Sequence, residues 1–149
     1  MQPIRKAAQD DRFRLAEIEV TDYRLYFYPI FHSDRYFFCE LTVAAVAEEY
    51  RERPERIERT FVYDDGAVKG FIRVNGEEIE KLFVEPAFWG QGIGGRLLEH
   101  ALAHTQARRL LVLEKNERAI RFYRRHGFHT TEQRQPVGDT NEQFIVMER

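Results

Sequence analysis

Cysteine and long apolar runs are scarce in this chain, and each shortage excludes a class of protein. The 149 residues include one cysteine, Cys39, so neither an intrachain disulfide nor a zinc site with several thiolate ligands can form. No apolar run approaches the roughly 18 residues that a membrane-spanning helix needs, and the N-terminal segment lacks the apolar core of a signal peptide. We therefore expect a cytoplasmic protein without a membrane partner, in which Cys39 is a small buried or half-buried apolar side chain.

An excess of charge of one sign is also missing. Lys and Arg number 23 against 25 Asp and Glu, which gives a formal net charge of −2. Because the chain lacks an overall positive field, its composition does not favour a nucleic-acid partner. The few residues of glycine (9) and proline (5) form no linker, repeat or low-complexity tract, so we expect a single domain over residues 1–149.

The chain does contain a regular succession of strand and helix patterns. The expected strands cover residues 3–7 and 109–113 and two segments at the C-terminal end, and the expected helices start near residue 13 and cover residues 41–53, 93–107 and 117–126. Between the second and third helices, residues 59–84 hold three β-type runs separated by Asp-Asp-Gly and Asn-Gly turns. The order β-α-α-β-β-β-α-β-α-β-β predicts an α/β fold of the α+β kind, with a mixed sheet covered by helices.

Residues 23–38 are unusually aromatic, because they hold eight of the twenty aromatic residues in the chain. Aromatic side chains bury large areas in cores and interfaces and also line ligand pockets. We expect a mixture of these roles, in which some rings cap the core or a dimer contact and others line a pocket.

The strongest chemical signal is a glycine-rich turn between a strand and a helix. Gly90, Gly92, Gly94 and Gly95 fall within six residues, at the start of an amphipathic helix. Glycines let the main chain approach a ligand and point several N–H groups at it, and a helix N-terminus adds the positive end of its dipole. The turn therefore predicts a binding site for a phosphate-bearing ligand.

A nicotinamide or flavin dinucleotide is one phosphate-bearing ligand that such a turn can hold. Residues 90–95 match the pattern G-x-G-x-x-G, and Glu114 ends the next strand. However, residues 85–89 separate the preceding strand from the first glycine, and the remaining chain is too short for the second half of a dinucleotide-binding domain. The separation of the strand from the turn and the short remaining chain therefore disfavour a dinucleotide.

Two blocks of sequence carry more specific information. The first is a strand end, Phe83-Val84-Glu85-Pro86, followed by Trp89-Gly90-Gln91-Gly92-Ile93-Gly94, and the second is LLVLEKNERAIRFYRRHGF at residues 110–128. Both resemble the GNAT superfamily of N-acetyltransferases: the first falls on its acetyl-CoA motif, R/Q-x-x-G-x-G/A, and the second on its strand-Asn-helix-Tyr-Gly-Phe segment. Trp89 departs from the motif, where Arg or Gln is usual. The resemblance covers nearly the whole chain and implies a GNAT-like acetyl-CoA-binding fold.

The resemblance implies acetyl-CoA as cosubstrate and assigns residues to it. The main chain of Leu82, Phe83 and Val84 would pair with the pantetheine arm as an added strand does. The residues that would surround the pyrophosphate are Gly90, Gln91, Gly92, Ile93, Gly94, Gly95 and Arg96. Asn116 would contact the cofactor as well, although its place directly before an acidic first turn equally suits a helix N-cap.

The resemblance also implies catalytic residues. Tyr123, which lies beside the cofactor in the family, would protonate the departing thiolate as general acid. The attacking amine, with a pKa near about 10.4, must lose a proton. Glu80 is the first choice as base and Glu78 the second, because both alternate on one strand face with Leu82 and Val84, and some branches of the family use neither.

The expected activity is that of an acetyl-CoA-dependent N-acetyltransferase without a metal. The acetyl group would pass directly, in a ternary complex, to a primary amine of a small molecule, an amino acid or a peptide N-terminus. Leu111 stands where the ribosomal-protein N-terminal acetylases of the family carry a glutamate, which weakens the protein-acetylase interpretation. The alternative is a non-catalytic acyl-CoA-binding or sensing module, and either would act as a monomer or a homodimer.

Overall fold

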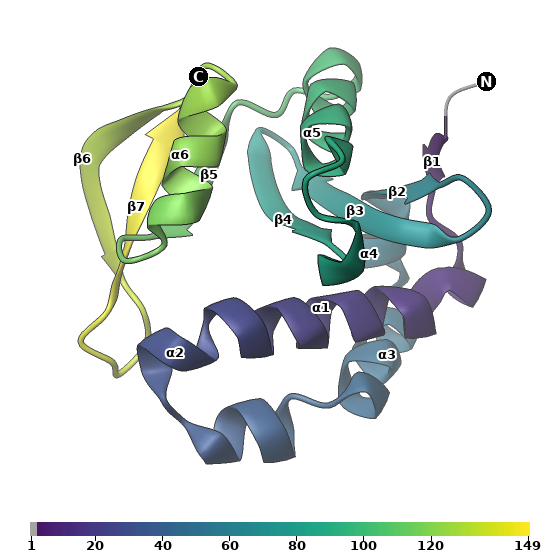
Figure 1. Cartoon of the computed structure of the whole chain (residues 1–149), viewed down its shortest axis with the longest axis horizontal. Coiled ribbons are helices and arrows are strands. Elements are labelled where there is room, and N and C mark those ends of the chain that lie inside the picture. The colour runs from purple at the N-terminus through teal and green to yellow at the C-terminus, as the bar shows by residue number, and fades with distance from the viewer. Residues whose placement is uncertain (1–2) are drawn as a thin grey trace.

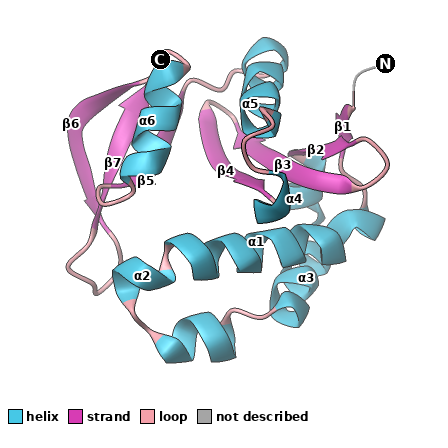
Figure 2. Cartoon of the chain, viewed as in Figure 1, coloured by secondary structure: helices cyan, strands magenta, loops and turns pink. Residues whose placement is uncertain are grey.

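The computed structural model describes residues 3–149, which form a seven-stranded sheet with helices on both faces (Figures 1 and 2). The strands are β1 (Ile4–Lys6), β2 (Thr60–Asp64), β3 (Val68–Asn75), β4 (Glu78–Val84), β5 (Arg109–Leu113), β6 (His129–Pro136) and β7 (Gln143–Glu148). The α-helices are α1 (Arg12–Tyr26), α2 (Tyr28–Phe31), α3 (Val43–Glu52), α4 (Pro54–Glu58), α5 (Ile93–His104) and α6 (Glu117–Arg125). Shorter helical turns are η1 (Gln9–Asp11), η3 (Pro86–Phe88) and the π-helical η2 (Tyr36–Glu40).

The strand order is β1-β2-β3-β4-β5-β7-β6, and every neighbouring pair is antiparallel except β4 and β5. The parallel pair is short: Glu78 lies opposite Arg109 and Ile79 opposite Leu110, and no further residues pair. Beyond Ile79 the two strands diverge, and Figure 1 shows the sheet opening toward α1 at this point. The main chain of the second half of β4 is therefore left without a strand partner on its β5 side.

Two apolar cores lie on opposite faces of the sheet. One lies under α5 and α6 and includes Ile72, Leu97 and Met147, all fully buried. The other lies under α1 and α3 and includes Leu15 and Phe71. The mixed sheet covered by helices that the sequence predicts is confirmed, as are the three antiparallel strands of the central meander.

The expected helices agree with α1, α3, α5 and α6 to within a few residues, but the sequence did not lead us to expect α2, η2 or α4. Proline marks two of them, since Pro29 and Pro54 stand in the first turns of α2 and α4, where the missing N–H costs nothing. Pro54 therefore ends α3, as expected, and also begins α4. The prediction for Cys39 is wrong: the thiol is exposed, because it lies on the outer side of η2.

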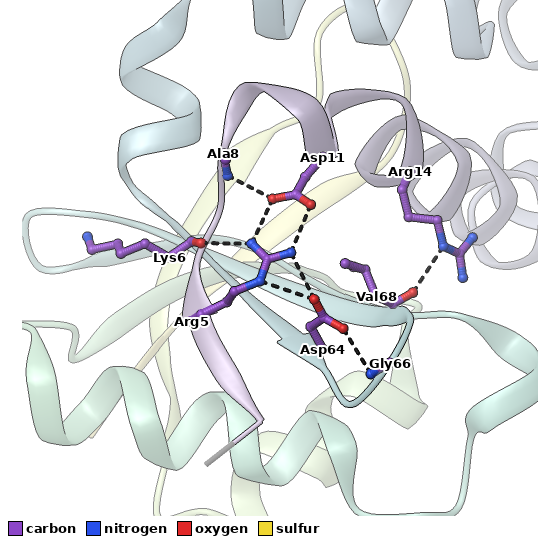
Figure 3. Close-up of polar contacts among 8 residues, drawn as sticks. All are labelled: Arg5, Lys6, Ala8, Asp11, Arg14, Asp64, Gly66 and Val68. Carbon is purple, nitrogen blue, oxygen red and sulfur yellow. Dashed lines mark hydrogen bonds and ion pairs between the residues drawn. The ribbon is translucent and has the colours of Figure 1, made fainter. Parts of the chain in front are cut away.

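Arg5 ties the N-terminal strand to its neighbours (Figure 3). Its guanidinium donates to both carboxylate oxygens of Asp11, at 2.9 and 3.0 Å, and to Asp64 Oδ2, at 3.0 and 3.1 Å. Asp11 also accepts from the Ala8 N–H at 2.7 Å. Arg5 lowers the pKa of the Asp11 carboxyl, and the Gly66 N–H and Arg5 together lower the pKa of Asp64. β1, η1 and the β2–β3 turn are thus held by one charged cluster.

None of the helices within residues 3–149 has the length and apolar character needed to cross a membrane.

Candidate active site

A cavity of about 950 Å³ lies where β4 and β5 diverge. Residues 78–83 and 110–113 of the two strands form its sides. Asn116 and Ala119 reach it from the start of α6, and Tyr123 from the second half of that helix. The turn between β6 and β7 closes another side, through residues 137–144. The cavity therefore follows directly from the divergence of the strands, which removes the hydrogen-bonded neighbour that would otherwise fill this space.

Aromatic residues from α1, α2 and η2 form the remaining wall. The rings that line it are those of Tyr23, Phe27, Phe31, Tyr36 and Phe37. Phe37 is also buried in the core, whereas Tyr36 is 46% exposed at the edge of the cavity. The expectation that some rings of residues 23–38 cap the core and others line a pocket is therefore confirmed.

Tyr123 projects from α6 into this cavity, as expected. Its ring packs on Phe122 and Phe128, at centroid distances of 5.1 and 5.7 Å, because the left-handed Gly127 turns the chain back directly after the helix. Burial raises the pKa of the Tyr123 phenol above its ordinary value. The hydroxyl consequently stays protonated at neutral pH, which a proton donor requires.

Glu78 and Glu80 both line the cavity, but the prediction that they share a strand face with Leu82 and Val84 is wrong. The register shifts within the β3–β4 pair, since Val74 lies opposite Ile79 whereas Arg73 lies opposite Lys81. Glu80 is therefore the extra residue of a β-bulge, and a bulge interrupts the alternation of side chains. Ile79, and not Glu80, lies with Leu82 and Val84 on the face of the sheet that α5 and α6 cover.

Arg73 distinguishes the two acids. Its Nε lies 3.4 Å from Glu80 Oε1, and its side chain is only 6% exposed. This Nε makes no hydrogen bond within residues 3–149. Glu80 thus balances a buried cation, whereas Glu78 has no Lys, Arg or His nitrogen within 4.0 Å among the residues that the structure describes.

A buried polar cluster beside the cavity was not foreseen from the sequence. The Lys81 ammonium donates to the Tyr23 hydroxyl and lies 3.9 Å from Glu19 Oε2, while the Tyr50 hydroxyl donates to Glu19 Oε1 at 3.0 Å. Burial opposes the charged form of Lys81, but Glu19 and Tyr23 outweigh it and raise the pKa. Lys81 is therefore a fixed cation in the wall of the cavity. No local sequence motif predicts this cluster, because its other members come from α1 and α3.

The glycine-rich turn has the shape that the sequence predicts. Gly90 and Gly92 have φ angles of +81° and +80°, which other residues rarely adopt, and Gly92 is the N-cap of α5. No side chain among residues 3–149 caps this end of the helix, so within that part of the chain the first N–H groups of α5 remain available to a ligand. A Cβ at Gly90 or Gly92 would meet nothing within 4 Å, so the space over the turn is open. The turn fits a phosphate group.

Three other residues assigned to the cofactor have roles in packing or capping. A Cβ on Gly95 would lie 3.2 Å from the His126 ring, so this glycine permits the close approach of α5 and α6. Arg96 donates to the Tyr63 hydroxyl at 3.0 Å and so turns toward β2. Asn116 caps α6, since its side chain accepts from the Ala119 N–H at 3.2 Å, and it lines the cavity as well.

The two histidines of α5 do not line the cavity. His100 and His104 stack on one another in the outward row of α5, with ring centroids 4.1 Å apart. Within residues 3–149, no three His, Cys, Asp or Glu side chains are placed so that they could hold a metal ion together.

Comparisons with known proteins agree with this geometry. The family model described as "Acetyltransferase (GNAT) domain" matches residues 56–130, half of the chain. The peptidyl-lysine N-acetyltransferase YjaB of Salmonella typhimurium is 37% identical over 86 residues, which cover 58% of this chain and 59% of that protein. This chain thus spans less than two thirds of that relative. YjaB of Escherichia coli, with the same description, is 32% identical over 68% of this chain and 75% of its own length.

Solved structures show the same fold. The solution structure of E. coli YjaB in its apo form has a TM-score of 0.69 at 22% identity, covering 97% of this chain and 95% of its own. The PaiA N-acetyltransferase of Thermoplasma acidophilum, solved in complex with coenzyme A, has a TM-score of 0.72 at 19% identity, covering 98% and 97%.

Proposed function

This chain belongs to the GNAT family of acetyltransferases, and from that premise we propose that it transfers an acetyl group from acetyl-CoA to the side-chain amine of a lysine in a polypeptide. The observation that carries the proposal is the cavity between the diverging ends of β4 and β5, into which Tyr123 projects. The lysine acceptor is supported by the two relatives described as peptidyl-lysine N-acetyltransferases.

The donor would be held by main-chain groups on one side of the cavity. Residues 82–84 of β4 have no strand partner on the β5 side. The Val84 carbonyl already accepts from the Trp89 indole N–H at 2.8 Å, so the main chain before Val84 is what remains for the donor. The open turn at residues 90–94 offers N–H groups and the N-terminus of α5 to the phosphates. When bound, acetyl-CoA supplies an activated thioester, and the chain has to position it, exclude water and move two protons.

The acceptor would enter from the aromatic side. Tyr36 lines the cavity and is partly exposed, and Phe38, 51% exposed, lies two residues further along η2. Tyr36 at the cavity and the neighbouring exposed Phe38 suit contact with a polypeptide on either side of its lysine. The long apolar stem of a lysine side chain suits an aromatic channel, while the polar ammonium needs a carboxylate at the end.

A carboxylate and a phenol would divide the proton transfers. Glu78 or Glu80 removes a proton from the lysine ammonium, and the free amine attacks the thioester carbonyl. As the new C–N bond forms and the C–S bond breaks, the Tyr123 hydroxyl gives its proton to the departing sulfur, and the second proton lost from the nitrogen restores the phenol. No covalent bond to the protein is needed, so both substrates are bound when the acetyl group moves.

The test is acetylation of a defined peptide. We expect acetyl-CoA and CoA, at about 100 times their dissociation constants, to raise the melting temperature by several degrees. NAD at the same concentration should not raise it. With a peptide whose α-amine is blocked, mass spectrometry should find one acetyl group on the lysine, and thiol release should match it. The matched control is the same peptide with norleucine in place of the lysine.

Two results would overturn parts of the proposal. Acetylation of free α-amines but not of the blocked peptide would remove the lysine acceptor and leave the acetyltransferase. A melting shift with CoA but no turnover on any amine would favour a module that binds acyl-CoA without catalysis.

A further inference from the structure

Trp89 occupies the first position of the motif R/Q-x-x-G-x-G/A, so this chain lacks the polar side chain that usually begins the turn. On the premise that acetyl-CoA is the donor, we propose that Arg118 of α6 binds the diphosphate of the cofactor and supplies at this turn the polar side chain that Trp89 does not.

Arg118 is held directly over the aromatic residue that begins the turn. Its guanidinium carbon lies 4.3 Å from the Trp89 ring centroid and 4.9 Å from that of Tyr26. The two rings stack on one another, 4.8 Å apart at an interplanar angle of 30°. Trp89 itself is fixed by its indole N–H, which donates to the Val84 carbonyl at 2.8 Å. Contact with ring faces uses the charge of a guanidinium but leaves N–H groups free to donate.

The position of Arg118 is the junction between the turn and the cavity. Trp89 directly precedes the left-handed Gly90, and Asn116 and Ala119, on either side of Arg118 in the chain, both line the cavity. A donor whose phosphates lie on the turn and whose thioester lies beside Tyr123 has to pass this junction. A cation at that place meets the donor near its phosphate end.

The charge of Arg118 is not neutralised by its surroundings. The side chain is exposed, and no Asp or Glu oxygen lies within 4.0 Å of it among residues 3–149. Glu85, at the start of the turn, is engaged by Arg14 at 3.5 Å. Asp22 lies beneath, but burial and Glu85 raise the pKa of this carboxyl to about 8, so it is mostly neutral at pH 7.

The exposed guanidinium of Arg118 is the hydrogen-bond donor that a ligand can reach at the stack. Asp22 Oδ1 and the Tyr26 hydroxyl lie beside it, but both atoms are buried, without a hydrogen-bond partner within the described part of the chain, and so are out of reach of a bound ligand. Arg pairs with phosphate through two parallel N–H bonds, and a diphosphate is both an anion and a hydrogen-bond acceptor, so it complements this side chain.

Other cations near the turn are directed elsewhere. Arg96, at the start of α5, donates to Tyr63 and faces β2. Arg125, at the far end of α6, lies 6.0 Å from the Phe122 ring. Arg121 is exposed one turn after Arg118 and contacts neither Trp89 nor Tyr26, which makes it a matched control on the same helix.

The experiment uses two ligands that share a diphosphate. CoA and dephospho-CoA both carry it, and dephospho-CoA lacks only the 3′-phosphate. Binding is measured by calorimetry, and also by the fluorescence of Trp89, which is the single tryptophan of the chain and reports on this site alone. The proteins are wild type, Arg118→Ala, Arg118→Lys and Arg121→Ala, each checked by its melting temperature without ligand.

We expect Arg118→Ala to weaken both ligands by the same factor, about ten- to a hundred-fold, which corresponds to the loss of a charge-assisted hydrogen bond. Arg118→Lys should recover part of the loss because it keeps the charge but not the planar fork. Arg121→Ala should bind as wild type does.

Several results would overturn the assignment. Unchanged affinity in Arg118→Ala would do so while leaving the acetyltransferase proposal intact, since wild type still binds. A loss with CoA but not with dephospho-CoA would place Arg118 at the 3′-phosphate instead. Equal losses in Arg118→Ala and Arg118→Lys would indicate a packing role of the stacked side chain. Failure of wild type to bind either ligand would overturn the proposed function itself, and this inference with it.

Discussion

Single side chains distinguish the two carboxylates at the cavity. Glu80 lies against the buried guanidinium of Arg73, and protonation of Glu80 would leave that cation without its counter-charge. Glu78 is half-buried in the same cavity and forms no ion pair with a Lys, Arg or His among the described residues. We therefore infer that Glu78 is the base and that Glu80 stabilises the bulge, which reverses the preference that the sequence suggested.

Replacement of each acid by its amide separates these two roles. We expect Glu78→Gln to lower kcat about 10²- to 10⁴-fold, because general-base catalysis is lost, with an unchanged melting temperature. Glu80→Gln should lower the melting temperature instead, because Arg73 loses its charged partner. Steady-state kinetics and thermal melts measure both, with Glu77→Gln in the neighbouring turn as control. The reverse pattern would make Glu80 the base.

Tyr123 is the proposed donor of the second proton, and its replacement by phenylalanine removes only the hydroxyl. Contacts of the ring with Phe122 and Phe128 are kept, so the fold and the affinity for CoA should change little. We expect kcat to fall about 10²- to 10⁴-fold. Turnover is measured by thiol release and affinity by calorimetry. A variant with full kcat would show that the thiolate leaves without this acid.

At the scale of elements, the ends of α5 and α6 bring the main-chain groups of the site together. α5 begins at a glycine in a left-handed conformation with no side-chain cap, which leaves its N-terminus open. α6 begins at Asn116, which does cap the helix and thereby fixes the first turn that carries Arg118. One helix start is thus kept open for a ligand, and the other is closed by a side chain that also reaches the cavity.

Variants of Asn116 distinguish a cap from a cofactor contact. Asn116→Ala should destabilise the protein by about 1 kcal/mol, because an orphan N–H of α6 loses its acceptor. Asn116→Ser should restore the melting temperature, since serine is an equally good N-cap. We expect Asn116→Ser still to bind CoA more weakly than wild type, because the shorter side chain no longer reaches the cofactor. If serine restored the CoA affinity as well, capping alone would account for Asn116.

At the scale of the whole molecule, the sheet consists of two halves that are joined over a short distance. β4 and β5 pair at only two positions, and the cavity occupies the space beyond them. α1 passes beneath the opening (Figure 1). The stack of Tyr26, Trp89 and Arg118 connects α1, the glycine-rich turn and α6. At the far edge of the first half, the charged cluster around Arg5 attaches β1 and the start of α1.

Removal of the Arg5 cluster should lower stability in a pH-dependent way. The pKa values of Asp11 and Asp64 are lower in the folded state than the ordinary 3.8, so their contribution is complete above that pH and is lost as the pH falls through the folded values. Arg5→Ala should cost about 1 kcal/mol at pH 7, after allowance for solvent screening, or a few degrees of melting temperature.

The comparison needs thermal melts of wild type and Arg5→Ala at pH 7 and near pH 3, with Arg121→Ala as an exposed control. The difference between wild type and Arg5→Ala should shrink at the lower pH, where the aspartates begin to protonate. A difference that is the same at both pH values would mean that Arg5 acts through packing rather than charge.

The amino-acid sequence by itself determined most of the elements and the glycine-rich turn. The strand-glycine-helix segment, the Asn116 cap, the stop at Gly127 and the Asn-Gly turn depend on residues within a few positions of each other, and the structure contains all of them. Local backbone preferences and hydrogen bonds specify such features without help from distant segments.

Only the tertiary structure decided which side chains face the cavity. The direction of Glu78 and Glu80 depends on the register between β3 and β4, and one bulge was enough to reverse the expected face. The cluster of Lys81 with Glu19 and the placement of Arg118 over Trp89 join segments far apart in the chain. Contacts of this kind leave no local pattern in the sequence, because they follow from how α1, β4 and α6 come together around the opening of the sheet.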